Sequence, residues 1–349
     1  MRPQERDAPD DRRHARPPRS CPLCGSTDSE ALVIGYDRMV ARDGAFLYRR
    51  CTNCRLVAQD PLPTADEVLG FYPDGYEPHG TATTLADKRR RWINRLAISC
   101  FYDVRSFSRP RAVRAIFRAL AGRILPNTLE PHGRNRLLDV GCGSGDLLAR
   151  HRDLGWQVRG IEPHGQGRAA AVRRGLDVFP GTLLDPGFDD APFDVVLMSH
   201  VIEHVPDPVA YLRRAAELLA PNGKIVVVTP NIRSCGFQIY GSCWYPLDAP
   251  RHLMLLDPDT LRRLATQAGL RARMVRTVGA ARLWCESRHY ARTQGLALPA
   301  EVGARRQLLE ESARRKPAYR EFRRLVRPIA FACALLGRGD LMEAEISRG

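Results

Sequence analysis

Four cysteines near the start of the chain have the spacing of a metal site. Cys21 and Cys24 form one C-x2-C pair, Cys51 and Cys54 form a second, and 26 residues separate the pairs. Four thiolates in two such turns suit a tetrahedral Zn²⁺ ion, and a closed shell of sulfurs leaves no open position for catalysis. We therefore predict a structural zinc site, whose metal supplies folding energy that so small a module lacks. Four buried free thiols, an iron–sulfur cluster or a redox pair are alternatives for the same residues.

A glycine-rich turn that follows an acidic residue is the second candidate site. The segment LLDVGCGSG (137–145) places Asp139 two residues ahead of the first of three glycines. Such glycines let the backbone approach a ligand closely at the start of a helix. The dinucleotide fingerprint G-x-G-x-x-G is broken, because Asp146 stands at its sixth position. An aspartate repels a pyrophosphate but pairs with an ammonium group, so we expect a ligand with a cationic amine.

A carboxylate ends the next apolar run along the chain. Glu162 closes the segment QVRGIE, seventeen residues past Gly145. In nucleoside-binding Rossmann sheets, a carboxylate at the tip of the second strand accepts hydrogen bonds from both ribose hydroxyls. Glu162 fits that role, and a solvated loop acid is the alternative.

Apolar runs alternate with helical patterns through the part of the chain that carries these residues. We predict strands at 136–140, 157–162, 176–179, 193–198, 224–229, 272–278 and 341–346, with helices at 145–154, 165–174, 207–220 and 258–268. This alternation is typical of an α/β fold with a doubly wound sheet. We expect a Rossmann-like sheet of seven strands, the last of them antiparallel, preceded by the small four-cysteine zinc module.

The composition divides the chain into four parts. Its 349 residues, 44% hydrophobic and 27% charged, indicate a globular protein of roughly two domains. We predict a disordered tail over 1–19, the zinc module over 20–60, a linker with basic helices over 61–130, and the α/β domain over 131–349. Within that domain we predict a lid loop at 231–256 and a helical insertion at 280–337.

Charge and hydropathy exclude some classes of protein. The net charge of +15 invites a nucleic-acid partner, but 51 of the 54 basic residues are arginine, which indicates codon bias more than selection for phosphate contacts. No run of about eighteen apolar residues predicts a spanning helix, and the N-terminus lacks a secretory signal, so we expect a cytoplasmic protein with reduced thiols. The basic and apolar stretch 305–337 suits either a peripheral membrane contact or a helix that covers the sheet. Nothing in the sequence specifies an oligomeric state.

Several segments together resemble the class I S-adenosylmethionine-dependent methyltransferases over roughly residues 134–280. They are LDVGCGSG, GIEPH, FDVVLMSHVIEHVPDP, LLAPNGKIVVVTPN and WYPLDAPRHL. The SHVIEHVPDP and PRHL segments look like the branch that holds small-molecule O- and C-methyltransferases of the ubiquinone-biosynthesis type. A zinc module ahead of such a domain is similar to sugar C-methyltransferases, and it also occurs in some ribosomal RNA guanine methyltransferases.

The resemblance implies a role for each part of the sheet edge. The methionine part of S-adenosylmethionine would lie against Asp139 and the loop Gly141–Gly145, and the ribose against Glu162. The implied cofactor-binding residues are Asp139, Gly141, Cys142, Gly143, Gly145, Glu162, Pro163, Thr182, Leu183, Ser199 and His200. Thr182 and Leu183 would flank adenine, although the family often has an aspartate where Thr182 stands.

Three histidines are candidates for a general base, which methyl transfer needs only when the acceptor must lose a proton. His200 is expected at the carboxyl end of a central strand, where such sheets bind ligands. His204 follows Glu203 at the start of the next helix, and His252 lies within the predicted lid. For each histidine a purely structural role is the alternative.

The sequence leaves three functions open. The first is methylation of a small molecule such as a sugar, a polyketide or a quinone-like intermediate. The second is methylation of RNA, with the zinc module and the arginines of 88–123 binding phosphates. The third is a non-catalytic interaction module, against which the intact acid–glycine loop and Glu162 both argue.

Overall fold

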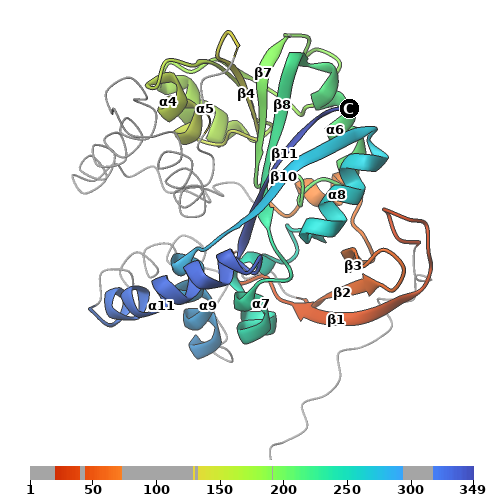
Figure 1. Ribbon diagram of the computed structural model, residues 1–349, viewed down its shortest axis with the longest axis vertical. Helices are drawn as coiled ribbons and strands as arrows, with labels where there is room; N and C mark the ends of the chain where they lie inside the picture. Colours follow the sequence, from red (N-terminus) through yellow and green to blue (C-terminus); the bar gives the residue numbers. More distant parts are fainter. Residues whose placement is uncertain (1–19, 40–43, 73–128, 130–132, 191, 294–316) are drawn as a thin grey trace, which may run out of the picture.

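The computed structural model describes residues 20–39, 44–72, 129, 133–190, 192–293 and 317–349 (Figure 1). The predicted tail over 1–19 and the basic helices predicted within 61–130 lie outside these ranges. The described residues form two sheets, of four and of seven strands.

The seven-stranded sheet confirms the predicted fold class. Its order is β10-β11-β8-β7-β4-β5-β6, and β11 runs antiparallel to both neighbours. The strands are β4 (Arg136–Val140), β5 (Gln157–Ile161), β6 (Val178–Phe179), β7 (Phe193–Ser199), β8 (Leu219–Pro230), β10 (Leu270–Val278) and β11 (Leu341–Arg348). Six consecutive residues of β7 are buried, as expected for a central strand that is covered on both faces.

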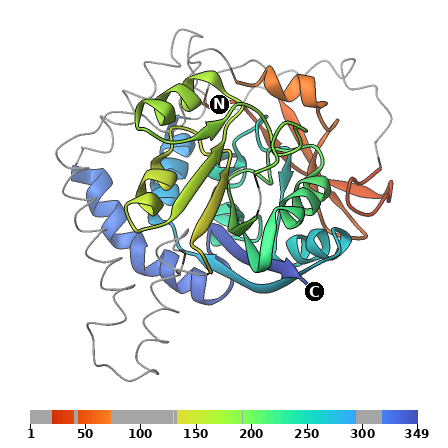
Figure 2. The same cartoon turned by 90° about the horizontal axis from the view of Figure 1, so that it is seen from above.

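Helices cover both faces of this sheet. Figures 1 and 2 show α4 (Asp146–Arg152) and α5 (Gly165–Arg173) on one side, with α6 (Pro208–Glu217) and α8 (Pro258–Gln267) on the other. The start of α6 follows from its sequence, because the carboxylate of Asp207 accepts a hydrogen bond from the amide of Ala210 and Pro208 needs no amide partner there.

The strand order reverses beside β4, which is hydrogen-bonded to β5 on one side and to β7 on the other. In open α/β sheets, ligands bind outside the carboxyl ends of the strands at such a reversal. Asp139 lies near the end of β4, and the turns that follow β4, β5 and β7 contain Gly141–Gly145, Glu162 and His200, so the fold places the predicted site residues at one edge.

The cysteine module forms a second sheet that uses a distant part of the chain. Its strands β1 (Ser29–Gly35), β2 (Phe46–Cys51) and β3 (Val57–Asp60) are antiparallel, and β3 pairs with β9 (Met254–Leu255). Helix α1 (Ala65–Leu69) follows, with a capping box between Thr64 and Glu67. The module is therefore joined to the α/β domain through the segment predicted as a lid.

That segment, 231–256, is largely buried. It contains α7 (Cys235–Tyr240) and two short 3₁₀ turns, and both Trp244 and Arg251 are at most 1% exposed. Motion of the segment as a lid stays a prediction.

The helices α9 (Ala281–Thr293) and α11 (Pro317–Leu335) lie within the predicted insertion. Val326 and Ala330 of α11 pack against Trp284 of α9, whereas Leu325 and Leu336 are 67% and 78% exposed. None of the described helices is both long and apolar enough to cross a membrane. A peripheral membrane contact by this stretch stays a prediction.

Candidate functional site

The four predicted metal ligands come together in the module. The Sγ atoms of Cys21 and Cys54 lie 3.4 Å apart, those of Cys24 and Cys51 lie 3.5 Å apart, and all four are within 4.8 Å of one another. Sulfurs that share a tetrahedral Zn²⁺ lie about 3.8 Å apart, since each Zn–S bond is about 2.3 Å. The donor set and its spacing therefore fit a structural zinc ion.

Both cysteine turns have the same backbone form. The amide of Gly25 donates to the carbonyl of Cys21 at 2.8 Å, and the amide of Arg55 donates to that of Cys51 at 3.0 Å. Gly25 and Arg55 hold corresponding left-handed positions, with φ of 73° and 67°. Glycine was the visible signal in the first turn, whereas the second adopts this conformation with an arginine.

We expect the purified protein to contain one zinc per chain and to lose the module's structure without it. Cys51→Ser should abolish stoichiometric zinc and lower the melting temperature, because the metal supplies folding energy to a small core. Atomic emission and calorimetric melting measure the two effects. Cys243→Ser, at a buried cysteine outside the cluster, is the control for thiol loss alone. Full zinc content in Cys51→Ser would contradict the assignment.

The glycine turn after β4 is built from left-handed residues. Gly141, Gly143 and Gly145 have φ of 65°, 54° and 75°. A Cβ atom on Gly141 would approach Val201 to 2.9 Å, and one on Gly145 would approach Leu176 to 2.3 Å. Gly143, by contrast, has no atom of the described residues within 4 Å of that position, so its open side is where a ligand can approach the backbone.

We expect Gly145→Ala to destabilise the protein. The left-handed backbone costs a non-glycine residue about 1 kcal/mol, and overpacking against Leu176 adds about 1–3 kcal/mol. Denaturant unfolding measures the loss, with Gly155→Ala as the control, because Gly155 is also left-handed (φ 91°) but has open space around it. Equal losses in the two variants would show that the contact with Leu176 adds nothing.

Asp139 is buried behind this turn with one oxygen left over. Its side chain is 2% exposed, and its Oδ2 atom has no hydrogen-bond partner among the described residues. Burial, and then the negative charge of Glu162, raise the pKa of Asp139 to about 8. A buried carboxylate with an unused oxygen is suited to a cationic ligand group, which would supply the missing partner.

Glu162 lies at the tip of β5 and braces the glycine turn. Its Oε2 atom accepts from the amide of Gly143 at 2.7 Å, and its Oε1 atom accepts from the amide of His164 at 2.9 Å. Each carboxylate oxygen can accept a second hydrogen bond, so the residue can still bind a diol.

The remaining predicted cofactor residues differ in their surroundings. Cys142 directs its side chain into a core cluster with Leu148, and Pro163 is exposed beside Glu162. The amide of Thr182 donates to Asp185 at 2.6 Å, and Leu183 is fully buried in the main core. The side chain of Leu183 is thus unavailable for adenine, and contact of this turn with a cofactor stays a prediction.

His200 and Glu203 form a dyad at the end of β7, just past Ser199. The Nδ1 atom of His200 lies 3.0 Å from Oε1 of Glu203, while the His200 side chain is 40% exposed and that of Glu203 only 1%. His200 is also left-handed, with φ of 58°, a strained conformation that is enriched at functional sites. Burial alone would raise the pKa of Glu203, but the hydrogen bond and charge of His200 lower it to about 2. An ionised carboxylate that orients an accessible imidazole is the arrangement of a general base.

His204 and His252 lie deeper, with ring centroids 4.5 Å apart. Burial and the neighbouring His252 lower the pKa of His204 to about 3, so it is neutral and a weak base near pH 7. The Nδ1 atom of His252 lies 2.7 Å from the carbonyl oxygen of Pro246 and donates a hydrogen bond to it. Of the three predicted histidines, His200 is therefore the one whose surroundings suit proton transfer.

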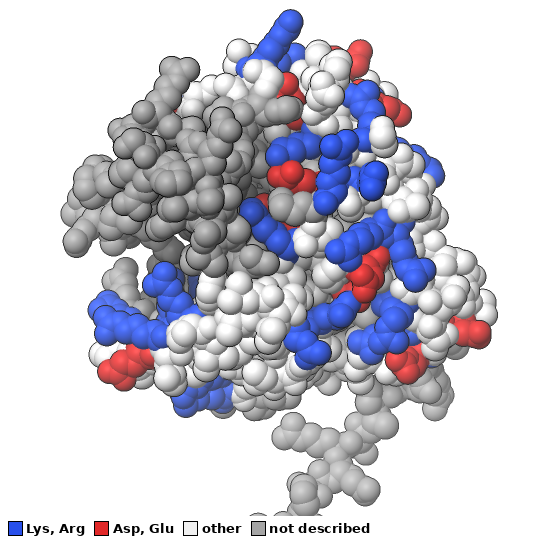
Figure 3. All heavy atoms as spheres, in the orientation of Figure 1, with Lys and Arg blue, Asp and Glu red and all other residues white. Residues whose placement is uncertain are grey.

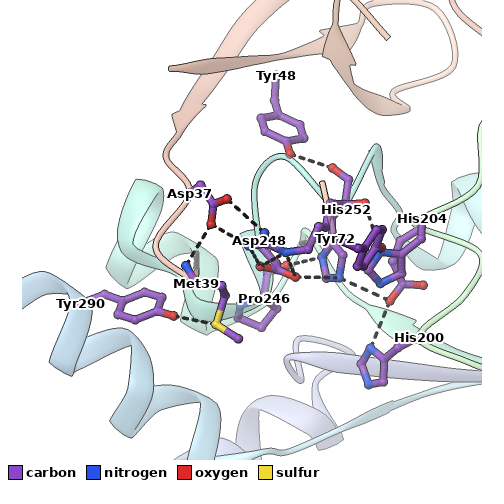
Figure 4. A network of polar contacts seen from close by, with 12 residues as sticks. Asp37, Met39, Tyr48, Tyr72, His200, His204, Pro246, Asp248, His252 and Tyr290 are labelled. Atoms are coloured by element: carbon purple, nitrogen blue, oxygen red, sulfur yellow. Dashed lines mark hydrogen bonds and ion pairs between the residues drawn. The ribbon is translucent and has the colours of Figure 1, made fainter. Parts of the chain in front are cut away.

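The structure adds residues that sequence reasoning did not select (Figure 4). The hydroxyl of Tyr72 lies 2.9 Å from Nδ1 of His204, and its ring lies 4.5 Å from that of His164 at a tilt of 42°. Arg251 is fully buried between Asp37 and Asp248. Only the PRHL segment hinted at Arg251, whereas Tyr72 and Asp37 stand in segments without a recognisable motif.

This cluster could also hold a divalent cation. One ligand atom each from Glu203, His204 and His252 lies within 4.8 Å of the other two, and Oε2 of Glu203 has no hydrogen-bond partner among the described residues. Carboxylate and imidazole ligands suit several divalent metals.

Comparison with known proteins finds similarity to methyltransferases over the middle of the chain. A family model described as a methyltransferase domain matches residues 105–274. The ubiquinone biosynthesis O-methyltransferase of Caulobacter sp. (strain K31) is 34% identical over 172 residues, which cover 45% of this chain and 65% of that protein. The enzyme of the same name from Cereibacter sphaeroides (strain ATCC 17025) is 37% identical over 147 residues, covering 39% and 60%.

The chain spans less than two thirds of the length of these relatives. Among solved structures, an S-adenosylmethionine-dependent methyltransferase from Archaeoglobus fulgidus is 18% identical, with a TM-score of 0.41 over 68% of this chain and 93% of that one. A similarity so distant carries no information about the reaction.

Proposed function

We propose that the protein transfers a methyl group to a small molecule. The chain contains a class I S-adenosylmethionine-dependent methyltransferase domain, and the proposal rests on that domain. The acceptor we infer has a hydroxyl or an acidic C–H group, as in a sugar, a polyketide or a quinone-like intermediate. RNA is the alternative acceptor.

One observation carries the proposal for the cofactor. Asp139 keeps a buried oxygen that no described residue hydrogen-bonds; it lies at the strand-order reversal, next to the open backbone of Gly143 and close to Glu162. Asp139 suits an amine, Gly143 a close contact with the backbone, and Glu162 a ribose. S-adenosylmethionine offers both an ammonium group and a ribose.

The dyad of His200 and Glu203 supports an acceptor that loses a proton. Bound S-adenosylmethionine supplies a methyl group already activated on a sulfonium, so the protein mainly has to align the acceptor. His200 would accept the acceptor's proton, and the buried Glu203 would hold the imidazole and stabilise its charged form. The names of the O-methyltransferase relatives agree with a hydroxyl acceptor.

The distribution of charge favours a small molecule over RNA. Figure 3 shows arginines and lysines interspersed with carboxylates on the described part of one face. Several arginines of the described residues are paired: Arg174 with Asp146 at 2.7 Å, and Arg262 with Asp259 at 2.9 Å. Paired arginines release fewer counterions from a phosphate backbone. The arginines of 88–123 lie outside the described residues.

A labelled-cofactor screen tests the proposal. The protein is incubated with S-adenosylmethionine carrying a labelled methyl group and a small-molecule extract, and labelled products are identified by mass spectrometry. We expect label in one class of small molecule, and filter binding to RNA that is weak and independent of sequence. Tight RNA binding that collapses with salt, with label in RNA, would favour the alternative.

Calorimetry with S-adenosylhomocysteine tests the cofactor separately from the acceptor. We expect one site per chain. Folded protein that gives no heat would favour a non-catalytic, zinc-organised interaction module.

A further inference from the structure

We propose that Asp37 and Tyr48 of the cysteine module are positioning residues, which hold the loop of Arg251 and His252 in place beside the catalytic dyad. The proposal rests on the proposed function in one respect only, because it assigns catalysis to the dyad of His200 and Glu203. The contacts themselves do not depend on the acceptor.

Asp37, just after β1, holds the side chain of Arg251. Its two carboxylate oxygens accept from two guanidinium nitrogens of Arg251 at 2.9 and 3.1 Å, and both side chains are fully buried. The amide of Met39 donates to Asp37 at 3.0 Å and orients it. On its other side, Arg251 donates to Asp248 at 2.7 Å. A bidentate, fully buried ion pair of this kind fixes both the distance and the angle between its partners.

Tyr48 on β2 holds the backbone of the same loop. Its hydroxyl donates to the carbonyl oxygen of His252 at 2.7 Å, and its ring is fully buried. Asp37 and Tyr48 thus hold adjacent positions of the loop. Asp37 binds the side chain of Arg251, and Tyr48 binds the main chain of His252 (Figure 4).

This loop in turn supports the turn after β7 that carries His200 and Glu203. The amides of Leu253 and Met254 donate to the carbonyl oxygen of Glu203 at 2.8 and 3.3 Å. The carbonyl oxygen of Arg251 lies 3.1 Å from Nδ1 of His204. A displacement of the loop would therefore move the backbone of Glu203, whose carboxylate orients His200.

The same loop is tied to the metal-bearing part of the module. The amide of Gln59 on β3 donates to the carbonyl oxygen of Leu253 at 2.9 Å, and β3 pairs with β9 directly afterwards. Leu253 and Met254 share a core cluster with Cys51 and Cys54. The cysteine module is thus part of the catalytic architecture, whatever else it binds.

The test uses the zinc-loaded, full-length protein and two variants, Asp37→Asn and Tyr48→Phe. Both substitutions keep the side-chain shape and remove only a charge or a hydroxyl. Long-range ¹H–¹⁵N correlation of labelled histidines reports the tautomer of His252, which is held as Nδ1–H by the carbonyl of Pro246. We expect both variants to shift His252 to a mixture of tautomers, with S-adenosylhomocysteine affinity within about twofold of wild type.

Once the screen has identified an acceptor, we expect both variants to lower kcat about 10- to 100-fold with KM for S-adenosylmethionine unchanged. Arg50→Gln is the matched control, because Arg50 lies on β2 near Tyr48 but pairs with Glu30, which is 59% exposed. We expect it to change neither the His252 signal nor kcat.

Two results would overturn the proposal. One is a wild-type His252 signal and wild-type kcat in both variants. The other is an equal change in Arg50→Gln, which would reduce the effect to general destabilisation of the module. If wild-type protein fails to bind S-adenosylhomocysteine, the proposed function fails, while the His252 signal still decides whether the module positions the loop.

Discussion

His200→Ala is expected to lower kcat about 10²- to 10⁴-fold. The side chain is 40% exposed and hydrogen-bonded to a buried carboxylate, so it is placed to accept a proton from a bound acceptor. Single-turnover rates with the identified acceptor measure the chemical step directly.

His289→Ala on α9 is the control for His200→Ala, since it removes a histidine outside the site. Glu203→Gln should also lower kcat, because the amide cannot stabilise the charged imidazole. A variant with His200→Ala that keeps near-normal kcat would show that the acceptor needs no base, or that His204 or His252 provides it.

Asp139→Asn is expected to weaken cofactor binding about 100-fold, which corresponds to about 3 kcal/mol for loss of one partner of a buried ion pair. The pKa of Asp139 is about 8 in the free protein, so much of it is protonated near pH 7. An ammonium ligand needs the carboxylate form. We therefore expect wild-type affinity to rise from pH 6 to pH 8, with release of a proton on binding, and the variant to lose this dependence. Titration calorimetry in buffers of different ionisation enthalpy measures both effects.

The same substitution should change the stability of the free protein in the opposite direction. An acid whose pKa is raised on folding stabilises the protein at low pH, and this contribution is lost as pH rises from about 4 to about 8. Asp139→Asn should therefore make the ligand-free protein more stable than wild type near pH 8, although it binds the cofactor less well. Asp146→Asn, an exposed acid of the same turn, is the control. Equal affinities of wild type and Asp139→Asn would contradict the role assigned to Asp139.

The elements that the sequence predicted well are those with local signals. Period and length located the seven strands of the larger sheet and the helices α4, α5, α6 and α8, and the start of α6 followed from Asp207 and Pro208. The predicted strand at 176–179 is shorter than expected, because β6 pairs only with β5 at the edge of the sheet. The spacing of the two C-x2-C pairs likewise predicted that the four cysteines come together.

The pairing of β3 with β9 had no such signal. Val57 pairs with Leu255, which is 198 residues further along the chain, and a two-residue strand has no periodicity to detect. The segment 231–256 was predicted to be a lid loop, because it is too long for a tight connection between two elements. Its burial depends on the module that packs against it.

The sequence by itself determined the chemistry available to this protein: four thiolates at metal spacing, an acid ahead of a glycine turn, and a carboxylate one strand further on. Those signals are readable because each depends on residues that are neighbours along the chain or follow a regular period. Only the tertiary structure decided which histidine suits a base and what holds it. Arg251 meets Asp37 across 214 residues and His252 meets Tyr48 across 204, and burial among such distant segments lowers the pKa of His204.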